Sequence, residues 1–384
     1  TTFTTPSSWR LQKHLREAVK AGCEYAIVEV TSHALDQNRV WGVDFDVAVI
    51  TNVTREHLDY HKTIEEYAKI KERLFKMVSK NPKGISVVNL GMDKPDVFLN
   101  YEVKEKYGYG IKVQSSKFKV QSDSLKLKIV EAESIKLDIH NSQFTIHNSQ
   151  FTLNLPGEFN VENALAATCV GLSQGISLEK ISEALAKIKG IPGRMERIEN
   201  NKGIEIIVDY AVTPDSLEKL YDYINQMRSS SHPTPASRDL PSGRGGRIIA
   251  VFGACGERDR GKRPIMGKIV GKAADYVFVT NEDPYNEDPQ QIINEVFAGV
   301  VTPPPTSPLY QGGEDKGGLK TEGINAFRIL DRHEAIKKAL EMARAGDIVV
   351  VTGKGAEETM AIGAERIPWN DPKVIREVLG ELEK

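Results

Sequence analysis

The stretch IIAVFGACGERDRGKRP, residues 248–264, shows the pattern on which the chain is built. The apolar residues 248–252 predict a buried strand over 247–253, and a glycine-rich turn separates this strand from a helix that starts near Pro264. A strand that enters a helix through a short turn is the repeating unit of a doubly wound parallel sheet.

The same turn has the composition of an anion-binding loop. Glycines let backbone amides approach a negative group, and a helix N-terminus favours negative charge. The turn also supplies four cations, Arg258, Arg260, Lys262 and Arg263. We expect a phosphate or carboxylate site here rather than a solvated basic turn. The glycine spacing matches neither a Walker A sequence nor Gly-x-Gly-x-x-Gly.

Strand and helix patterns alternate along both halves of the chain, which predicts an α/β protein. The expected strands are 25–30, 45–52, 204–210, 247–253, 275–280, 326–330 and 347–352. A capping box at Thr63 predicts the start of one helix. Residues 113–155 contain short alternating runs, such as 125–129, which suggest antiparallel strands added to the first sheet. The heptapeptide IHNSQFT, at 139–145 and again at 146–152, is interpreted as a local insertion that lengthens a hairpin.

Length and composition predict two domains. A chain of 384 residues exceeds what one hydrophobic core usually organises. The glycines and proline of residues 190–193 lie between a helix and a new strand, so we divide the chain into residues 1–191 and 192–384. Two polar stretches, 229–246 and 303–318, are expected to be mobile surface insertions.

Charge and cysteine content exclude several classes of protein. The formal charge of -2 provides no basic excess for nucleic acid, and no apolar run approaches the roughly 20 residues that cross a bilayer. Cys23, Cys169 and Cys255 are odd in number and far apart, which argues against a disulfide framework or a zinc site and favours a reducing, cytoplasmic compartment. Because the chain starts at Thr1 within a structured-looking segment, we expect a longer parent protein.

Three residues of the first half could form a metal site. Glu29 ends an apolar strand, where open α/β sheets place their ligands, although a polar residue at a strand end is equally common. His57, in the loop 54–61, could bind a metal or belong to an ordinary loop. Lys71 lies beside an apolar helix surface, where a partly neutral amine could form a carbamate and so become an anionic ligand; the alternative is a lysine that extends to water.

Two carboxylates of the second half are expected at the same edge of its sheet. Asp209 ends the strand 204–210 and could accept a ribose hydroxyl or simply belong to a turn. The sequence TGKGAE after the last strand contains another glycine turn, which would bring Glu357 to the same crevice.

The order of these segments resembles the Mur ligases, in particular the branch that adds the third amino acid to the peptidoglycan precursor. The segments that carry the resemblance are TTP at 4–6, EVTSHALDQNRV from 29, TNVTREHLDYH from 51, YAKIK ending at 71, GEFNVENALAA from 157, GRME from 193, DYAVTPDSLE from 209, GERDRGKRP from 256 and GKGAE from 353. They span nearly the whole chain in family order, and this shared order is more specific than any single motif.

The resemblance implies a fold, a reaction and roles for residues. The fold is a central ATPase-type parallel sheet with added antiparallel strands, followed by a Rossmann-like C-terminal domain. ATP would phosphorylate the D-glutamate carboxylate of UDP-N-acetylmuramoyl-L-alanyl-D-glutamate, and an amine would attack the acyl phosphate. Glu29, His57 and carbamylated Lys71 would surround Mg²⁺, an ion that prefers hard oxygen ligands.

The other implied roles concern the three substrates. Residues that match positions for the muramoyl dipeptide are Thr4, Thr5, Ser32, Gln37 and Arg39. Those on the ATP side are Asn160, Asn163, Asp209 and Lys262. The pocket for the incoming amino acid would contain Arg258, Glu282, Asp283, Tyr285, Gly353 and Glu357. We expect only small-molecule partners, no nucleic acid or membrane, and a monomer.

Three departures from the family pattern matter. The Gly-x-x-Gly-Lys-Thr/Ser loop and the uridine-binding domain, which precede the Thr-Thr-Pro segment in the family, are not in the sequence, so we expect residues 1–384 alone to be inactive. Val212 replaces a histidine near the nucleotide. Tyr285 replaces the arginine of the Asp-Asn-Pro-Arg motif that selects meso-diaminopimelate, and a tyrosine cannot make a bidentate carboxylate contact. Lysine, ornithine or another diamino acid is therefore an equal candidate.

Two other functions remain open at this stage. Folylpolyglutamate synthase shares the magnesium and nucleotide chemistry, although EVTSHALDQNRV and GKGAE favour the muramoyl branch. A non-catalytic binding remnant of the fold would also be consistent with Val212 and the missing phosphate loop.

Overall fold

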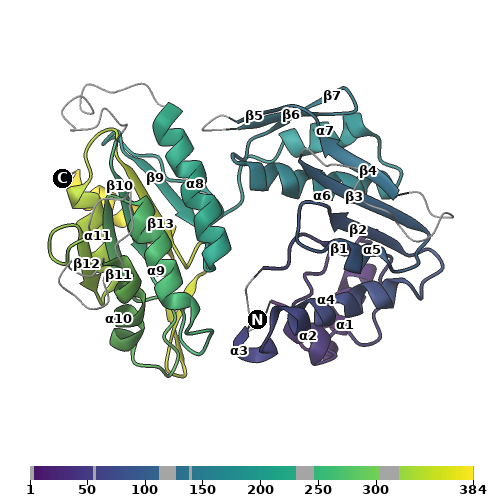
Figure 1. The fold of residues 1–384 in the computed structure, drawn as a ribbon, viewed down its shortest axis with the longest axis horizontal. Coiled ribbons are helices and arrows are strands. Elements are labelled where there is room, and N and C mark those ends of the chain that lie inside the picture. Colours follow the sequence, from purple (N-terminus) through teal and green to yellow (C-terminus); the bar gives the residue numbers. More distant parts are fainter. Residues whose placement is uncertain are drawn as a thin grey trace. The chain divides into compact units, whose positions relative to one another are not determined.

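A computed structural model of the chain describes residues 4–54, 58–111, 127–137, 141–230, 246–301 and 320–383 (Figure 1). The chain divides into two compact units, Thr1–Ile188 and Lys189–Lys384, and each is described by itself. The boundary that we expect from the sequence, after residue 191, lies close to this point. Of the two stretches predicted to be insertions, only 229–230 and 246 belong to the described residues.

The first unit contains a parallel sheet, as the alternating pattern predicts. Its strands are β1 (Val47–Ile50), β2 (Ile85–Asn89), β3 (Glu105–Ile111) and β4 (Leu127–Ala132), in the order β1-β2-β3-β4. All neighbouring pairs are parallel. The prediction of an antiparallel strand in the run 125–129 is therefore wrong. β4 extends the parallel sheet. Its buried Val130 pairs with Tyr109 of β3, and both side chains belong to the same hydrophobic core.

The antiparallel strands follow β4 in the chain. β5 (Ile135–Leu137), β6 (Ser142–Ile146) and β7 (Ser149–Leu153) form a separate sheet. Within the described residues, the duplicated heptapeptide supplies most of β6 and β7, and its two phenylalanines, Phe144 and Phe151, stack with ring centroids 5.2 Å apart. His147 and Asn148 form the turn with φ values of 46° and 65°, as a two-residue hairpin requires. The predicted hairpin is confirmed.

Helices cover both faces of the parallel sheet in the first unit (Figure 1). α6 (Glu158–Ser173) packs on one face with Val87, whereas α4 (Ile64–Val78) and α5 (Asp96–Leu99) pack on the other face with Val88. Successive strand residues point to opposite faces, so these two valines serve different cores. The predicted helix start is confirmed, because Thr63 Oγ1 accepts from the Glu66 N–H at 3.2 Å. The Thr63 N–H donates to the His61 carbonyl at 2.7 Å, so the second hydrogen bond of a capping box is not formed. The unit also contains α1 (Ser8–Lys20), α2 (Ser32–Asp36), α3 (Leu58–His61) and α7 (Leu178–Ala186).

Residues 25–30 do not form the buried strand that their sequence predicts. Tyr25 and Ile27 expose 63% and 99% of their surface. A strand needs a hydrogen-bonded neighbour, and among the described residues β1 pairs only with β2, so no strand lies against this segment. Val28 and Val30 still pack against Leu11 in a small cluster.

The second unit contains a sheet in the order β12-β11-β10-β13-β9-β8. Its strands are β8 (Glu196–Arg197), β9 (Glu205–Asp209), β10 (Ile248–Phe252), β11 (Tyr276–Thr280), β12 (Ala326–Ile329) and β13 (Ile348–Thr352). β9 to β13 are parallel and coincide with the strands predicted for this half of the chain, whereas the short β8 is antiparallel. The carboxyl ends of the parallel strands therefore meet at one edge.

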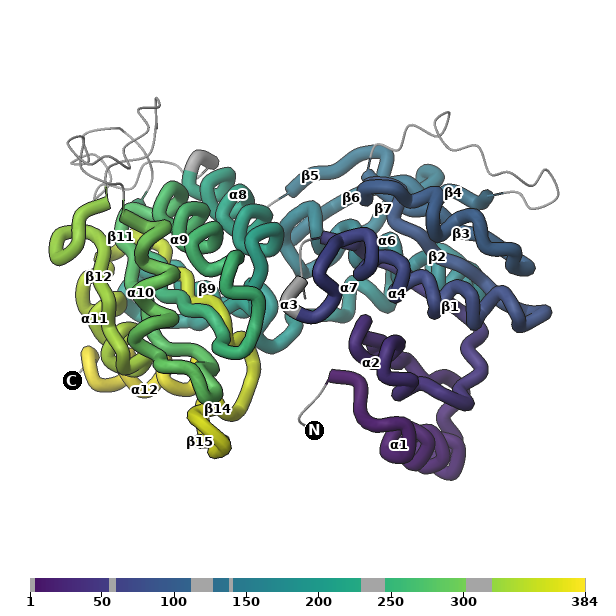
Figure 2. Tube along the Cα trace, turned by 60° about the horizontal axis from the view of Figure 1, so that its bottom comes forward, coloured from purple at the N-terminus to yellow at the C-terminus, as the bar shows by residue number. Residues whose placement is uncertain are grey.

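Helices flank both faces of this sheet as well. α11 (Arg332–Met342) and α12 (Asp371–Leu382) pack on one face with Val349 and Val351. α8 (Pro214–Ser230), α9 (Lys262–Ala273) and α10 (Pro289–Val300) lie side by side, and the last two contact β11. A hairpin of β14 (Thr359–Ile362) and β15 (Glu365–Pro368) follows β13 and projects from the unit (Figure 2). In the described part of the chain, no helix is both long and apolar enough to cross a membrane.

Candidate functional site

Thr5 connects the substrate-binding segments that were predicted for the first unit. Its buried hydroxyl donates to the Glu29 carbonyl at 2.7 Å and accepts from the Thr31 N–H at 3.1 Å. The Arg39 guanidinium donates to the Thr5 carbonyl at 3.0 Å and to Gln37 Oε1 at 2.6 and 2.9 Å. The structure thus brings together Thr5, Gln37, Arg39 and the backbone of Glu29.

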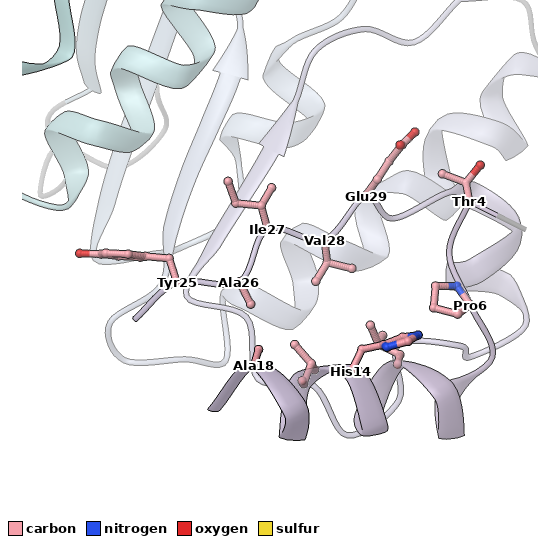
Figure 3. Close-up of a pocket in the computed structure, with 11 residues that line it drawn as sticks. Thr4, Pro6, His14, Ala18, Tyr25, Ala26, Ile27, Val28 and Glu29 are labelled. Atoms are coloured by element: carbon pink, nitrogen blue, oxygen red, sulfur yellow. The ribbon is translucent and has the colours of Figure 1, made fainter. Parts of the chain in front are cut away.

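A groove of about 270 Å³ lies between α1 and residues 25–29. Its lining is mainly apolar, with Leu11 and Leu15 of α1 on one side. Thr4 and Glu29 both line it, and the Glu29 side chain points away from α1 (Figure 3). Both residues are exposed. The Glu29 carboxylate is therefore accessible to a ligand.

Ser32 and Lys71 belong to a polar cluster near α4. Ser32 Oγ lies 2.8 Å from Nε2 of the buried His61, and the His61 and Tyr67 ring centroids are 5.4 Å apart. Lys71 Nζ lies 4.8 Å from the centre of the Tyr67 ring and donates to the Asn52 carbonyl at 3.4 Å. Because Asn52 follows β1, the Lys71 amine lies at the carboxyl edge of the first sheet.

The structure describes two of the predicted metal ligands, Glu29 and Lys71. His57 lies outside the described residues. Among the residues that the structure does describe, no three histidine, cysteine, aspartate or glutamate side chains gather into a metal-ligand set. Glu29 and Lys71 are therefore described as separate groups, each with its own contacts.

Asn160 and Asn163 lie one turn apart on α6. Asn160 is buried, and its side-chain amide donates to the Pro156 carbonyl at 2.7 Å. Asn163 is exposed. The first asparagine therefore holds the chain at the start of the helix, and the second is exposed to solvent.

The predicted amino-acid site of the second unit is a cluster of buried charges at the carboxyl edge of its sheet. Lys354 is fully buried and donates to Asp283 Oδ1 at 2.8 Å, and it also pairs with Glu357. Burial alone would lower the pKa of Lys354, but the two carboxylates raise it, so the ammonium stays charged. Asp283 Oδ1 also accepts from the Ala361 N–H at 2.7 Å. Lys354 thus joins the turn after β13 to the loop after β11.

Glu282 lies deeper in the same cluster. The Cys255 thiol donates to its Oε1 at 2.9 Å, whereas the buried Oε2 has no hydrogen-bond partner among the described residues. Burial raises the pKa of both groups, which favours a neutral thiol and a neutral carboxyl. Gly353 has φ of 115°, and a Cβ there would lie 2.5 Å from Glu282 Oε2. Glycine is therefore required at position 353 by both its backbone angle and its neighbour.

Asp209 directly precedes Tyr210, whose hydroxyl contacts Glu357. Asp209 Oδ2 accepts from the Met195 N–H at 2.8 Å, and burial raises the pKa of this carboxyl. The Tyr210 hydroxyl donates to Glu357 Oε1 at 3.0 Å, and the Arg194 guanidinium lies 4.8 Å from the centre of its ring. Asp209 therefore has a structural contact that the sequence did not reveal.

The cationic turn after β10 has fewer available cations than its sequence predicts. Arg263 is fully buried and pairs with Glu287 and Glu295, and Arg260 pairs with the same two carboxylates. The expectation that all four cations serve an anion is therefore wrong, because α10 and the loop before it neutralise two of them. Lys262 Nζ donates to the Val212 carbonyl at 2.9 Å. Arg258 has no ion pair within the described residues and is exposed.

Tyr285 is the centre of a group that the sequence reveals only in part. Its φ is 50°, its N–H donates to the Ala361 carbonyl at 3.3 Å, and its carbonyl accepts from the Gly363 N–H at 2.7 Å. The Arg258 and Arg366 guanidinium carbons lie 5.9 and 5.1 Å from the centre of its ring. Sequence reasoning missed Arg366 because no motif marks it, and only the hairpin β14–β15 brings it to Tyr285.

Comparisons with known proteins cover both units. Residues 1–171 match the Mur ligase middle domain, and residues 193–355 match the Mur ligase, glutamate ligase domain. The chain is 36% identical over 395 residues to UDP-N-acetylmuramyl-tripeptide synthetase of Roseiflexus sp. (strain RS-1), covering 99% of this chain and 69% of that protein. It is 37% identical over 386 residues to UDP-N-acetylmuramoyl-L-alanyl-D-glutamate--2,6-diaminopimelate ligase of Nostoc sp. (strain PCC 7120), covering 100% and 68%.

Solved structures agree with these matches. One of UDP-N-acetylmuramoyl-L-alanyl-D-glutamate--2,6-diaminopimelate ligase aligns with a TM-score of 0.55 and 29% identity, over 99% of this chain and 69% of that one. A folylpolyglutamate synthase of Mycobacterium tuberculosis aligns with a TM-score of 0.54 over 81% of this chain and 62% of that one. Its identity is 16%, so this second likeness concerns the fold alone.

Proposed function

The chain belongs to the Mur ligase family, and on this premise we propose that it joins a diamino acid to UDP-N-acetylmuramoyl-L-alanyl-D-glutamate in peptidoglycan synthesis. The observation that carries the proposal is the agreement of both domains with relatives whose names describe this ligation, at 36% and 37% identity over nearly the whole chain. The proposed domains are a middle domain, 1–191, and a C-terminal domain, 192–384. ATP and a UDP-linked sugar as substrates imply a cytoplasmic reaction, and we propose a monomer.

The proposed reaction has two steps. The D-glutamate carboxylate attacks the γ-phosphorus of ATP, which releases ADP and forms an acyl phosphate. The amine of the incoming amino acid then attacks the acyl carbon, phosphate leaves, and an amide remains after the amine loses a proton. Both steps bring anionic groups together, so catalysis depends on positioning and charge neutralisation.

The muramoyl dipeptide would bind the first unit at Thr4, Thr5, Ser32, Gln37 and Arg39. The hydrogen bonds of Arg39 to Thr5 and Gln37 support this assignment, because they hold three of these residues in one arrangement. A site that is ordered before its substrate arrives loses less conformational entropy on binding. The exposed Thr4 would supply a further hydroxyl.

Magnesium would be held by Glu29, His57 and Lys71 as its carbamate. The donor types fit this ion in part, since a carboxylate and a carbamate both offer hard oxygen atoms. The exposed Glu29 and the position of Lys71 at the carboxyl edge of the first sheet support the assignment. When bound, the ion would neutralise phosphate charge and hold the phosphates and the acceptor carboxylate in place.

ATP would bind near Asn160, Asn163, Asp209 and Lys262. Lys262 Nζ lies 2.9 Å from the Val212 carbonyl, so its ammonium stays close to the position where the family has a histidine. A backbone contact does not depend on the side chain at position 212. We therefore propose that Val212 weakens nucleotide binding without abolishing it.

The incoming amino acid would bind near Arg258, Glu282, Asp283, Tyr285, Gly353 and Glu357. Arg258 is exposed and carries no ion pair within the described residues, so it can receive a carboxylate. Glu357 is partly exposed, with 38% of its side chain accessible, and can receive an ammonium group. This charge pattern complements an amino acid.

The test measures ATP-dependent phosphate release and amide formation by the full gene product with Mg²⁺ and meso-diaminopimelate, L-lysine or L-ornithine. We expect release that depends on the UDP-linked muramoyl dipeptide. Release that depends on folate instead would favour the folylpolyglutamate synthase alternative, and no release with either acceptor would favour a non-catalytic remnant.

A further inference from the structure

Arg258 and Arg366 lie around one aromatic ring at the carboxyl edge of the second sheet. Their guanidinium carbons are 5.9 and 5.1 Å from the centre of the Tyr285 ring, so both cations lie close to the same ring. Arg258 comes from the turn after β10, and Arg366 comes from β15. Two cations from distant parts of the chain thus lie near a single side chain.

Backbone contacts hold Arg366 in this place. Ala361 pairs with Arg366 in the antiparallel register of β14 and β15, and the Ala361 carbonyl accepts from the Tyr285 N–H at 3.3 Å. Gly363, in the turn of the same hairpin, donates to the Tyr285 carbonyl at 2.7 Å. The hairpin and the loop after β11 are therefore joined on both sides of Tyr285. The fold therefore holds the backbone of Arg366 next to Tyr285.

Neither guanidinium is neutralised by a residue that the structure describes. Within the described residues, Arg258 and Arg366 make no ion pair and no hydrogen bond, and both are exposed. Other arginines of this unit behave differently, since Arg260 and Arg263 each pair with two carboxylates. An arginine beside an aromatic ring is held by cation–π attraction while its N–H groups remain available for a planar anion. Each of the two guanidiniums can therefore receive a negative group.

We propose that Arg366 binds the side-chain carboxylate of the incoming amino acid while Arg258 binds its α-carboxylate, which makes Arg366 a specificity-determining residue for a diamino dicarboxylic acid. The inference rests on the proposed function. An amino acid with one carboxylate, such as lysine or ornithine, has no use for a second unpaired guanidinium. A heptanedioic acid with amino groups at carbons 2 and 6 carries one carboxylate at each end, and each would receive a planar donor fork.

Tyr285 has a different role in this assignment from the one that its sequence position suggests. The sequence shows only that Tyr285 stands where the family motif has an arginine. Without that arginine, the sequence gives no reason to expect a substrate with a second carboxylate. The structure instead places an arginine from β15 beside the same side chain. Tyr285 then acts as a positioning residue that holds both guanidiniums.

The experiment compares Arg366→Gln with the unaltered full gene product, using meso-diaminopimelate and L-lysine as amino-acid substrates and measuring KM and kcat for each. Losing one charge-assisted contact is expected to raise the KM for diaminopimelate about 10- to 100-fold. The kcat should stay within about twofold, because this contact is remote from the reacting amine. The KM for lysine should not rise. Arg366→Lys should recover part of the loss, because the charge remains but the fork does not.

Arg344→Gln is the matched control. This variant removes the same charge from another exposed arginine of the same unit. Arg344 precedes β13 and therefore lies at the opposite edge of the sheet. If Arg366→Gln and Arg344→Gln give the same KM for diaminopimelate, the inference is overturned and the proposed ligase stands. Preference of the unaltered protein for lysine overturns the inference in the same way. Absence of ligation with every diamino acid removes both the inference and the proposed function.

Discussion

Arg332 and Asp371 form an ion pair that is completely buried in the second unit. Arg332 Nε lies 2.9 Å from Asp371 Oδ1, and Nη2 lies 2.6 Å from Oδ2, with both side chains inaccessible to solvent. The same guanidinium donates to the Thr352 carbonyl at 2.8 Å, and Asp371 also accepts from the Trp369 indole at 2.8 Å. The pair therefore joins the first turns of α11 and α12 to the end of β13, next to Gly353.

Removing one member of this pair should destabilise the protein strongly. Asp371→Asn and Arg332→Met each leave a buried charge or polar group without its partner, so the free energy of unfolding should fall by about 3–5 kcal/mol. The double variant Arg332→Met with Asp371→Leu should lose less than the sum of the single losses, because it leaves no charge behind. Chemical denaturation of the second unit measures these changes.

Lys337→Met provides the comparison. Lys337 pairs with Glu381 at 3.4 Å between the same two helices, but 35% and 54% of the two side chains are exposed. An exposed pair of this kind contributes about 0–1 kcal/mol. Equal losses for Lys337→Met and Asp371→Asn would show that burial does not govern the strength of the Arg332 interaction.

The parallel sheets could be predicted because each strand is marked by the sequence pattern of its own residues. Residues 348–352 are a run of β-branched residues bounded by turns, and such a run indicates a strand buried on both faces without reference to the rest of the chain. Residues 25–30 show the same local pattern and yet pair with no strand in the described part of the chain, because a strand also needs a neighbour, which the pattern cannot reveal. A local apolar run thus predicts that a segment can form a strand, but it does not predict whether a neighbouring strand is present to pair with it.

The candidate site could be predicted where a motif marks it and not where tertiary contacts decide. Glycine at position 353 follows from sequence, but its closeness to Glu282 does not. Arg263 looks like an anion donor until Glu287 and Glu295 from elsewhere in the chain are seen to neutralise it. Charge in a sequence therefore indicates an available site only after its partners in space are known.

Glu287 should make the stability of the second unit depend on acid pH. Its hydrogen bonds with the fully buried Arg263 lower the pKa of Glu287 from 4.5 to about 2. A lowered pKa in the folded state means that the contribution is complete above pH 4.5 and is lost as the pH falls towards 2. Since Glu287 is 20% exposed, we expect no more than about 3 kcal/mol from this group.

Glu287→Gln is the variant that tests this dependence. Unfolding by denaturant is measured between pH 5 and pH 2 for both proteins. The variant should be less stable at pH 5 and should lose less stability on acidification, so the two curves converge at the acid end. Parallel curves would mean that Glu287 has an ordinary pKa in the folded protein.

The three cysteines should differ widely in their reaction with an alkylating reagent. Cys23 is exposed, whereas Cys169 is buried and burial raises the pKa of its thiol to about 12. Burial and the neighbouring Glu282 also raise the pKa of Cys255. Because the thiolate is the reactive form, native Cys169 should react at least about 1000-fold more slowly than Cys23 at pH 8.

Timed labelling with iodoacetamide and peptide mass analysis can follow each cysteine separately. The same labelling in urea supplies the control, since unfolding should make the three rates similar. Rapid labelling of Cys169 in the native protein would show that α6 opens on the timescale of the reaction, and the buried packing described for this helix would then be incorrect.

Carbamylation of Lys71 predicts both a chemical signal and a loss of activity. The amine lies 4.8 Å from the centre of the Tyr67 ring and 3.4 Å from the Asn52 carbonyl, at the edge where the first sheet would receive its ligands. With ¹³C-bicarbonate, the protein should show a carbamate resonance that Lys71→Ala lacks, and this variant should lose at least about 100-fold in kcat because an anionic group that organises phosphate charge is removed. Lys69→Ala, two residues away on α4, is the matched control and should keep both the resonance and the activity. If Lys71→Ala retains full kcat, or if the resonance persists without Lys71, this lysine is not the carbamylated ligand, and its contacts with Tyr67 and Asn52 are then those of an ordinary ammonium group.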